Sequence, residues 1–161
     1  MTRSTAHDFD FLLGRWQVRH RRLRERLAGC DDWQLFDGSC SAQPLLGGHG
    51  NVDDNVLDLP GGAYRAVSLR SFDAGSGLWA IWWLDGRRPH ALDAPVLGGF
   101  ESGVGTFYAD DVFDGRPIRV RFRWDDTTTA APHWAQAFST DGGAGWETNW
   151  TMTFARVAGP G

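Results

Sequence analysis

Three side chains have the types and spacing to carry acid–base chemistry: His49, Asp53 and His90. A histidine exchanges protons near neutral pH, and a neighbouring carboxylate can orient it for general acid–base catalysis. His49 and Asp53 belong to one polar segment, and His90 follows Arg87-Arg88-Pro89. One hypothesis is therefore an enzyme with isomerase- or hydrolase-like activity, in which these residues transfer protons.

The polar segment covers residues 47–55, and alternation places His49, Asn51, Asp53 and Asn55 on one face of an extended strand. Such a row can line a cavity, position a water molecule or bind a metal weakly. No second histidine follows at a usual ligand spacing, so we expect no metal site. Because charged residues are normally solvated, we expect this face to point outward.

The first strand offers a binding function instead. His20 shares a face with Trp16 and Val18, and Arg22 follows on the same face. If this face is internal, a histidine and an arginine project into a cavity, which suits an anionic or polar ligand group. The alternative, which we favour, is that the arginines lie in solvent and pair with acids on neighbouring strands.

Two further motifs bear on function. His133 begins a predicted strand beside Trp134 and is the best-placed candidate for an axial haem ligand. Ser139-x-Asp141-x-Gly143-x-x-Trp146 fits the Asp-box pattern, in which the carboxylate accepts turn amides and glycine supplies positive φ. We interpret the Asp box as a structural turn.

Strands separated by glycine-, proline- and aspartate-rich turns must position these residues. A short helix is expected over residues 8–14. The predicted strands cover about 16–27, 33–42, 51–59, 63–72, 78–84, 96–101, 105–113, 118–124, 133–139 and 146–157. The segment 78–84 is apolar on both faces, so its outer face needs cover from the N-terminal helix or a partner subunit. The sequence thus predicts an all-β fold, a single closed up-and-down antiparallel β-barrel of about ten strands spanning residues 1–161.

Composition narrows the partners and the compartment. The formal charge of −4 gives no basic footprint for nucleic acid, and no apolar run is long enough to span a bilayer. Cys30 and Cys40 would lie about 30 Å apart along an extended segment, beyond disulfide reach. We therefore expect reduced thiols in a cytoplasmic protein, with no nucleic-acid or membrane partner.

The two ends of the chain resemble a known family. Asp10-Phe-Leu-Leu-Gly-Arg-Trp16 and the segment from Phe138 to Trp150 look like bacterial proteins grouped as domain of unknown function 1579. The Gly14-x-Trp16 start also resembles the calycin architecture of lipocalins, fatty-acid-binding proteins and nitrobindin-like haem proteins. The resemblance implies a calycin-like barrel and no particular reaction. Val18 stands where nitrobindin-like proteins extend the opening to Gly-x-Trp-x-Gly, a departure from the haem-binding pattern.

These patterns favour a binding protein with a cavity lined by aromatic residues, which takes a small apolar or aromatic molecule and needs no cofactor. An enzyme and a haem protein are the alternatives, and the apolar strand 78–84 leaves room for a homodimer. The predicted ligand-binding residues are Trp82, His20, Tyr108, Trp150, Asn55 and Arg22.

Overall fold

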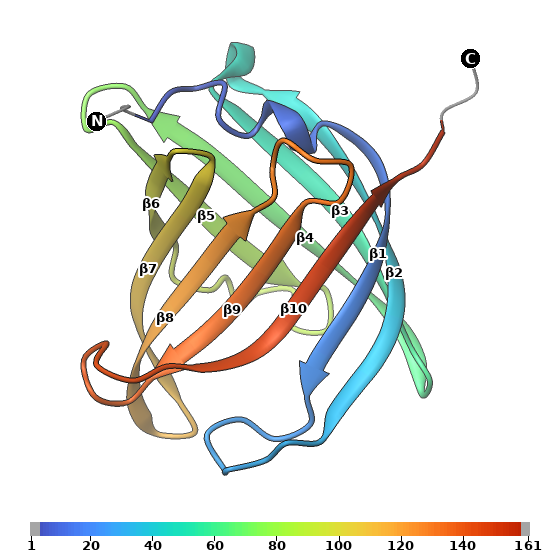
Figure 1. The fold of residues 1–161 in the computed structure, drawn as a ribbon, viewed down its shortest axis with the longest axis vertical. Coiled ribbons are helices and arrows are strands. Elements are labelled where there is room, and N and C mark those ends of the chain that lie inside the picture. Colours follow the sequence, from blue (N-terminus) through green and yellow to red (C-terminus); the bar gives the residue numbers. More distant parts are fainter. Residues whose placement is uncertain (1–3, 159–161) are drawn as a thin grey trace.

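Ten antiparallel strands follow one another in chain order around a closed wall (Figure 1). The computed structural model describes residues 4–158. The strands are β1 (Gly14–Leu23), β2 (Trp33–Leu45), β3 (Gly50–Leu59), β4 (Gly62–Asp73), β5 (Leu78–Asp85), β6 (Val96–Glu101), β7 (Val104–Phe113), β8 (Arg116–Asp125), β9 (His133–Ser139) and β10 (Glu147–Arg156). β1 pairs with both β2 and β10, which closes the barrel and confirms the predicted fold class.

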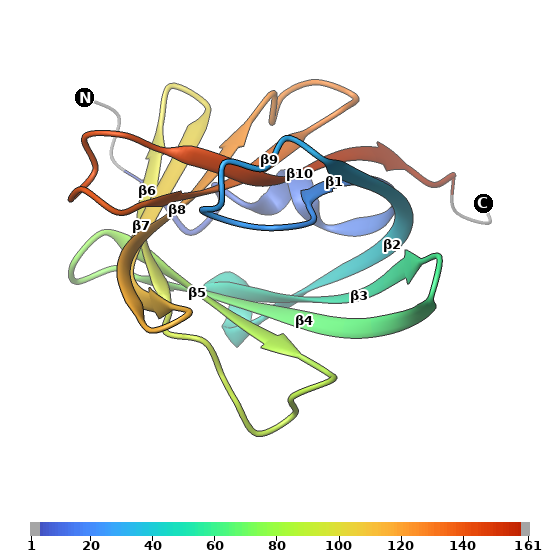
Figure 2. The same ribbon diagram turned by 90° about the horizontal axis from the view of Figure 1, so that it is seen from below.

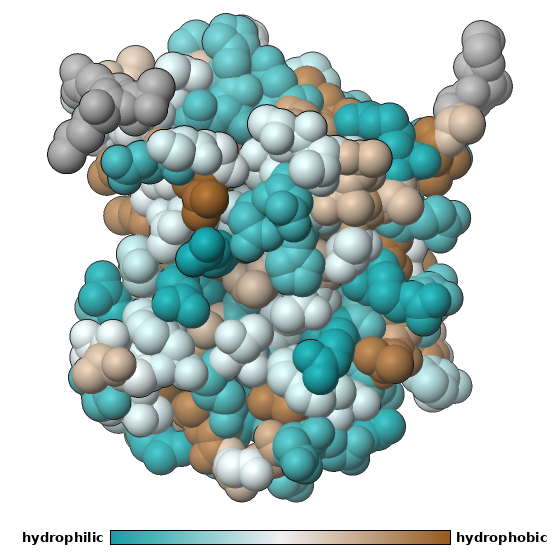
Figure 3. All heavy atoms as spheres, viewed as in Figure 1, coloured by the Kyte–Doolittle hydropathy of each residue, from teal (hydrophilic) through white to brown (hydrophobic). Residues whose placement is uncertain are grey.

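Alternation of apolar and charged residues explains why these segments form a barrel wall. In β8, Ile118, Val120 and Trp124 are buried, while the intervening arginines face outward. The outer face seen in Figure 3 accordingly shows mainly hydrophilic and neutral residues with scattered hydrophobic ones. Asp114 and Gly115 both adopt positive φ, of 51° and 75°, and so form the tight turn from β7 into β8.

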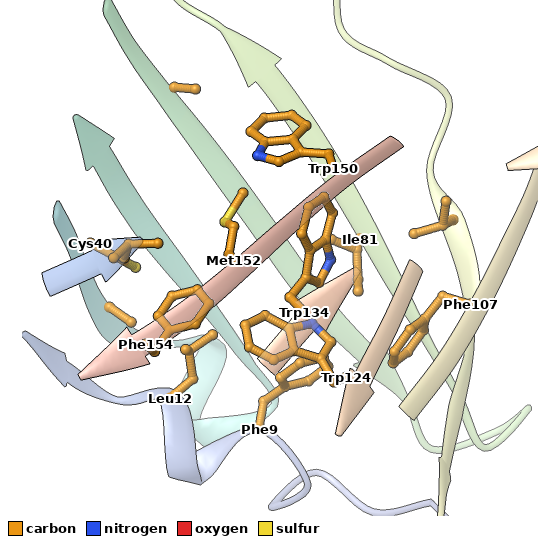
Figure 4. Packing of buried hydrophobic residues seen from close by; sticks show 14 of the residues in the cluster. Phe9, Leu12, Cys40, Ile81, Phe107, Trp124, Trp134, Trp150, Met152 and Phe154 are labelled. Carbon is orange, nitrogen blue, oxygen red and sulfur yellow. The ribbon is translucent and has the colours of Figure 1, made fainter. Parts of the chain in front are cut away.

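The N-terminal segment closes one end of the barrel. The helix expected over residues 8–14 is only a 3-10 turn, η1 (Asp10–Leu12), because Leu13 is already extended. Phe9 and Leu12 point into the barrel, where they are 1% and 0% exposed. Figure 4 shows them against Trp124 and Phe154, and Figure 2 shows the segment between the two walls of the barrel. We call this segment, residues 4–13, the plug.

Trp16 and Arg156 tie the plug to the first and last strands. The Trp16 indole Nε1 donates a hydrogen bond of 2.8 Å to the Leu12 carbonyl. The Arg156 guanidinium lies 4.1 Å from the centre of the Trp16 ring and donates to the carbonyls of Leu13 and Phe11. Trp16 is therefore held at this end of the barrel by contacts from both the plug and β10.

The outer face of β5 is not covered by the plug. Trp79 and Ile81 of β5 point into the barrel, and Trp79 Nε1 donates to the Thr5 carbonyl of the plug at 3.2 Å. Trp82 lies on the outer face, where its strand neighbour is Leu69 of β4. The plug thus packs into the barrel end. Within residues 4–158, no helix is both long enough and apolar enough to cross a membrane.

Candidate functional site

A cavity of about 530 Å³ occupies the barrel interior between the plug and the opposite, open end. Its inner part meets Trp124 and Phe154, which also contact the plug, and its outer part reaches the β1–β2 and β5–β6 segments and the β7–β8 turn. The apolar lining includes Ile81, Trp83, Val96, Phe122, Trp134, Phe138, Trp150 and Met152. The size is typical of small-molecule pockets, and the apolar wall is accompanied by many polar and charged residues.

Three tryptophans form a rigid part of this lining. The rings of Trp83 and Trp150 lie 5.7 Å apart and those of Trp134 and Trp150 lie 5.3 Å apart, both pairs at 89°. Phe122 adds an edge-to-face contact with Trp134 at 5.1 Å. Edge-to-face packing is a favoured aromatic geometry, so the ring faces that border the cavity are preorganised. Figure 4 shows Trp134 and Trp150 from β9 and β10 side by side.

His20 supports this wall from behind. Trp150 Nε1 donates a hydrogen bond of 3.1 Å to His20 Nδ1, and the imidazole stacks on Phe36 with the ring centres 4.6 Å apart. His20 is 2% exposed, and burial, together with the neighbouring Arg22 charge, lowers its pKa to about 3. The imidazole is therefore neutral and accepts at Nδ1, and it positions the Trp150 indole without lining the cavity itself.

The polar row of β3 lies inside the barrel, which corrects the expectation of a solvated outer face. Asn51, Asp53 and Asn55 are 3%, 2% and 6% exposed. Arg70 of β4 explains the inversion, because its guanidinium is buried beside them and pairs with Asp53 at 2.7 Å. Arg70 also donates to Asn51 Oδ1 at 2.9 Å, while the Ser68 amide and Asn55 Nδ2 both donate to Asp53. The charges of Asp53 and Arg70 therefore compensate each other in the interior.

The arginines of the first strand divide between the two alternatives. Arg19 and Arg24 are exposed and pair with Asp37 and Asp32 at 3.2 Å and 3.0 Å, as the solvated interpretation predicts. Arg22 instead lines the cavity, where its guanidinium lies about 5 Å from the Trp150 ring centre. The open end of the cavity is therefore polar and positively charged on the β1 side.

Tyr64 of β4 contacts a second cationic side chain besides Arg22, that of Arg87. Arg22 Nη1 donates to the Tyr64 hydroxyl at 2.9 Å, and the Arg87 guanidinium lies 3.6 Å from the Tyr64 ring centre. Arg87 forms a two-pronged ion pair with Asp85, whose pKa this hydrogen bonding lowers. Tyr64 thus separates two arginines, of which only Arg87 has a carboxylate partner.

Apart from His20, which lies buried behind Trp150, the predicted ligand-binding residues divide into cavity-lining and outer positions. Trp150, Asn55 and Arg22 line the cavity. Trp82 and Tyr108 lie on the outside of the wall, since their neighbours Trp83 and Phe107 point inward. Tyr108 contacts the Asp-box Trp146, with their ring centres 6.0 Å apart.

The three catalytic candidates are not brought together. His49 is exposed after η2 (Leu46–Gly48) at the end that the plug closes, and His90 is exposed in the β5–β6 segment at the open end. Asp53 lies in the interior with Arg70. Within residues 4–158, no group of three or more His, Cys, Asp or Glu side chains is placed to hold a metal ion.

His133 does not fit an axial haem ligand. Its neighbour Trp134 points into the barrel, so His133 lies on the outer face of β9, where Nδ1 is 3.3 Å from Thr153 Oγ1. Among the described residues, no histidine lines the cavity. A haem in this cavity would therefore have no imidazole ligand from the wall.

The Asp box forms the turn that its sequence predicts. Asp141 accepts hydrogen bonds from the Ser139 hydroxyl and the Gly145 amide, both at 2.8 Å. These bonds lower the Asp141 pKa. Trp146 Nε1 donates to the Gly143 carbonyl at 3.0 Å and packs over the turn. This hairpin joins β9 to β10 and faces outward.

The site residues that sequence reasoning missed include Trp83, Trp134, Tyr64 and Arg26. Trp134 shares a face with Gln136 and Phe138, and this alternation was a usable signal. Trp83 sits in a strand that is apolar on both faces, so its sequence carries no sign of which tryptophan points inward. Arg26 lies beyond β1 in a segment without periodicity.

Comparison with known proteins does not assign this chain to a family. No protein-family model matches this chain, and its sequence matches no curated protein. The closed ten-stranded barrel is consistent with a calycin-like architecture. The resemblance to domain of unknown function 1579 stays a prediction.

Proposed function

We propose that this protein binds a small, largely apolar or aromatic molecule inside its barrel. The observation that carries the proposal is the cavity of about 530 Å³, with one end closed by the plug and with tryptophans preorganised along its wall. Ligand pockets usually combine apolar walls with polar groups that orient the ligand. Here Asn55, Gln136 and Arg22 are among those polar groups.

We also propose that the protein is located in the cytoplasm. Cys30 and Cys40 are both free, and Cys40 is buried next to Trp16 in the strand register. Burial raises the pKa of the Cys40 thiol, which makes it unreactive. A free, inert thiol suits a reducing compartment.

A neutral aromatic probe tests the binding function. N-phenyl-1-naphthylamine fluoresces when it enters an apolar cavity, so the wild-type protein should bind it with saturation at one equivalent. Ala109 lines the cavity, and Ala109→Trp should fill the space and abolish saturable binding.

Ala80→Trp is the matched control, because Ala80 lies on the outer face of β5 between Trp79 and Ile81, which point inward. It should bind the probe as the wild type does, and circular dichroism should show both variants folded. Absence of saturable binding to the wild type, or equal binding by Ala109→Trp, contradicts the proposed function.

A further inference from the structure

The open end of the cavity holds two guanidinium groups without an ion-pair partner. Arg22 and Arg26 both line the cavity and both are half-buried. Across residues 4–158, neither forms an ion pair with a carboxylate. The other three arginines of the lining differ, since Arg70 and Arg87 are ion-paired and Arg88 is exposed.

Both guanidiniums lie over aromatic rings. Arg22 lies 5.1 Å from the Phe36 ring centre and 5.0 Å from that of Trp150, and Arg26 lies 5.7 Å from that of Phe138. Trp150 and Phe138 also border the cavity. A ligand whose apolar body rests on these rings therefore has its end beside two cations.

The local balance of charge leaves the two cations only partly compensated. Burial and the nearby charge of Arg22 lower the pKa of Arg26, which shows that each cation is unfavourable for the other. The Glu147 carboxylate offsets part of this effect, although it is not ion-paired with Arg26 and its Oε1 accepts a hydrogen bond of 2.8 Å from the Leu27 amide. An oxyanion between the two arginines would relieve this repulsion and accept from both.

Three acids of the cavity rim are exposed. Asp93, Asp111 and Asp114 belong to the β5–β6 segment, β7 and the β7–β8 turn. The β7–β8 turn contacts the β1–β2 segment, where Arg116 donates to the Leu27 carbonyl at 3.3 Å. These acids are exposed, so water screens them, whereas the arginines border the apolar cavity. The exposed acids therefore offset the charge of Arg22 and Arg26 less than a buried ion pair would.

We propose that the ligand is an amphipathic organic anion, with an apolar or aromatic body in the cavity and one oxyanion, such as a carboxylate or sulfonate, held by Arg22 and Arg26. This inference rests on the proposed function and specifies the chemical class of the ligand. Tyr64 positions Arg22 through the hydrogen bond between the Tyr64 hydroxyl and Nη1.

Two probes that differ only in charge test the inference. 8-Anilino-1-naphthalenesulfonate is N-phenyl-1-naphthylamine with one added sulfonate. The wild type should bind the sulfonate at least about tenfold more tightly than the neutral probe. Arg26→Gln and Arg22→Gln should each weaken sulfonate binding about tenfold and change neutral-probe binding less than twofold.

Arg121→Gln is the matched control, because Arg121 also stacks on a tryptophan, at 4.4 Å from the Trp146 ring centre, but lies outside the barrel. It should leave both affinities unchanged. Arg26 lies outside the strands, so Arg26→Gln keeps the test valid even if Arg22→Gln weakens folding.

The outcomes separate the two proposals. Equal wild-type affinity for both probes, or equal loss of both in the arginine variants, overturns the anion inference and leaves cavity binding standing. Failure of both probes to bind the wild type overturns the proposed function itself. A charge-selective loss confined to Arg22→Gln and Arg26→Gln supports both.

Discussion

His20 shows how one buried side chain can set the pH range over which the barrel is stable. Its pKa is about 3 in the folded protein, against 6.5 for an ordinary histidine, so the unfolded chain binds a proton that the folded protein does not. The contribution of His20 to the free energy of unfolding is therefore fully present only above pH 6.5, and it is lost as the pH drops towards 3. Between pH 7 and pH 5 we expect a loss of about 2 kcal/mol.

His20→Gln should remove this slope, because an amide oxygen can still accept from Trp150 but does not titrate. Urea unfolding at pH 7, 6 and 5 measures the effect. His133→Gln, on the outer face of β9, should retain the wild-type slope. Identical slopes for wild type and His20→Gln would show that the imidazole does not control this range.

The buried pair of Asp53 and Arg70 gives a second prediction at the residue scale. Asp53→Ala leaves the Arg70 guanidinium, with a side chain only 5% exposed, without a counter-charge. We expect a loss of about 3–5 kcal/mol in the free energy of unfolding. Asp37→Ala breaks the exposed pair with Arg19 and should cost at most about 1 kcal/mol. Equal losses in denaturant titrations would refute a special role for burial.

Among the elements, the plug depends most on local backbone geometry. Gly14 joins η1 to β1 with φ of +118°, and a Cβ there would lie 2.5 Å from Arg156 Nη1. Gly14→Ala should therefore strain the backbone and displace the guanidinium that binds the plug carbonyls. We expect a loss of about 1–3 kcal/mol, measured by thermal unfolding.

Gly61→Ala is the control for Gly14→Ala, because nothing lies within 4 Å of a Cβ at Gly61. Its effect should stay within about 0.5 kcal/mol. A Gly14→Ala protein as stable as this control would mean that the plug tolerates another backbone conformation at the start of β1.

The homodimer expected from the apolar outer face of β5 stays a prediction.

Turn chemistry and alternation allowed the strands to be predicted. For several strands, however, they did not predict which face points into the barrel. Asp114-Gly115 and the alternating arginines of β8 mark both the turn and the inner face. In β3, polar residues occupy both faces, and only Arg70 on the next strand decides which one is buried. A register shift between Thr148 and Trp150 in β10 puts Asn149 and Trp150 both inside, a change that no periodicity announces.

For the whole molecule, the site depends on contacts between residues far apart in the chain. Arg22 and Tyr64, or His20 and Trp150, meet only because the barrel closes. Sequence patterns report on neighbours along a strand, so they identified Trp150, Asn55 and Arg22 as candidate ligand-binding residues without deciding which way Asn55 and Arg22 point or showing their partners. Arg22 and Arg26 likewise come together at the open end only in the assembled barrel.

Closure through β1 and β10 also has a consequence for the time course of synthesis. One edge of β1 pairs with β10, over residues Trp150 to Arg156. The amides and carbonyls on that edge therefore stay unpaired until β10 has left the ribosome. The cavity wall, the Trp16–Arg156 contact and the hydrogen bond from Trp150 to His20 all form in that same late step. A nascent chain therefore presents an open sheet edge, and a chain truncated before β10 would present it permanently, as a surface prone to aggregation.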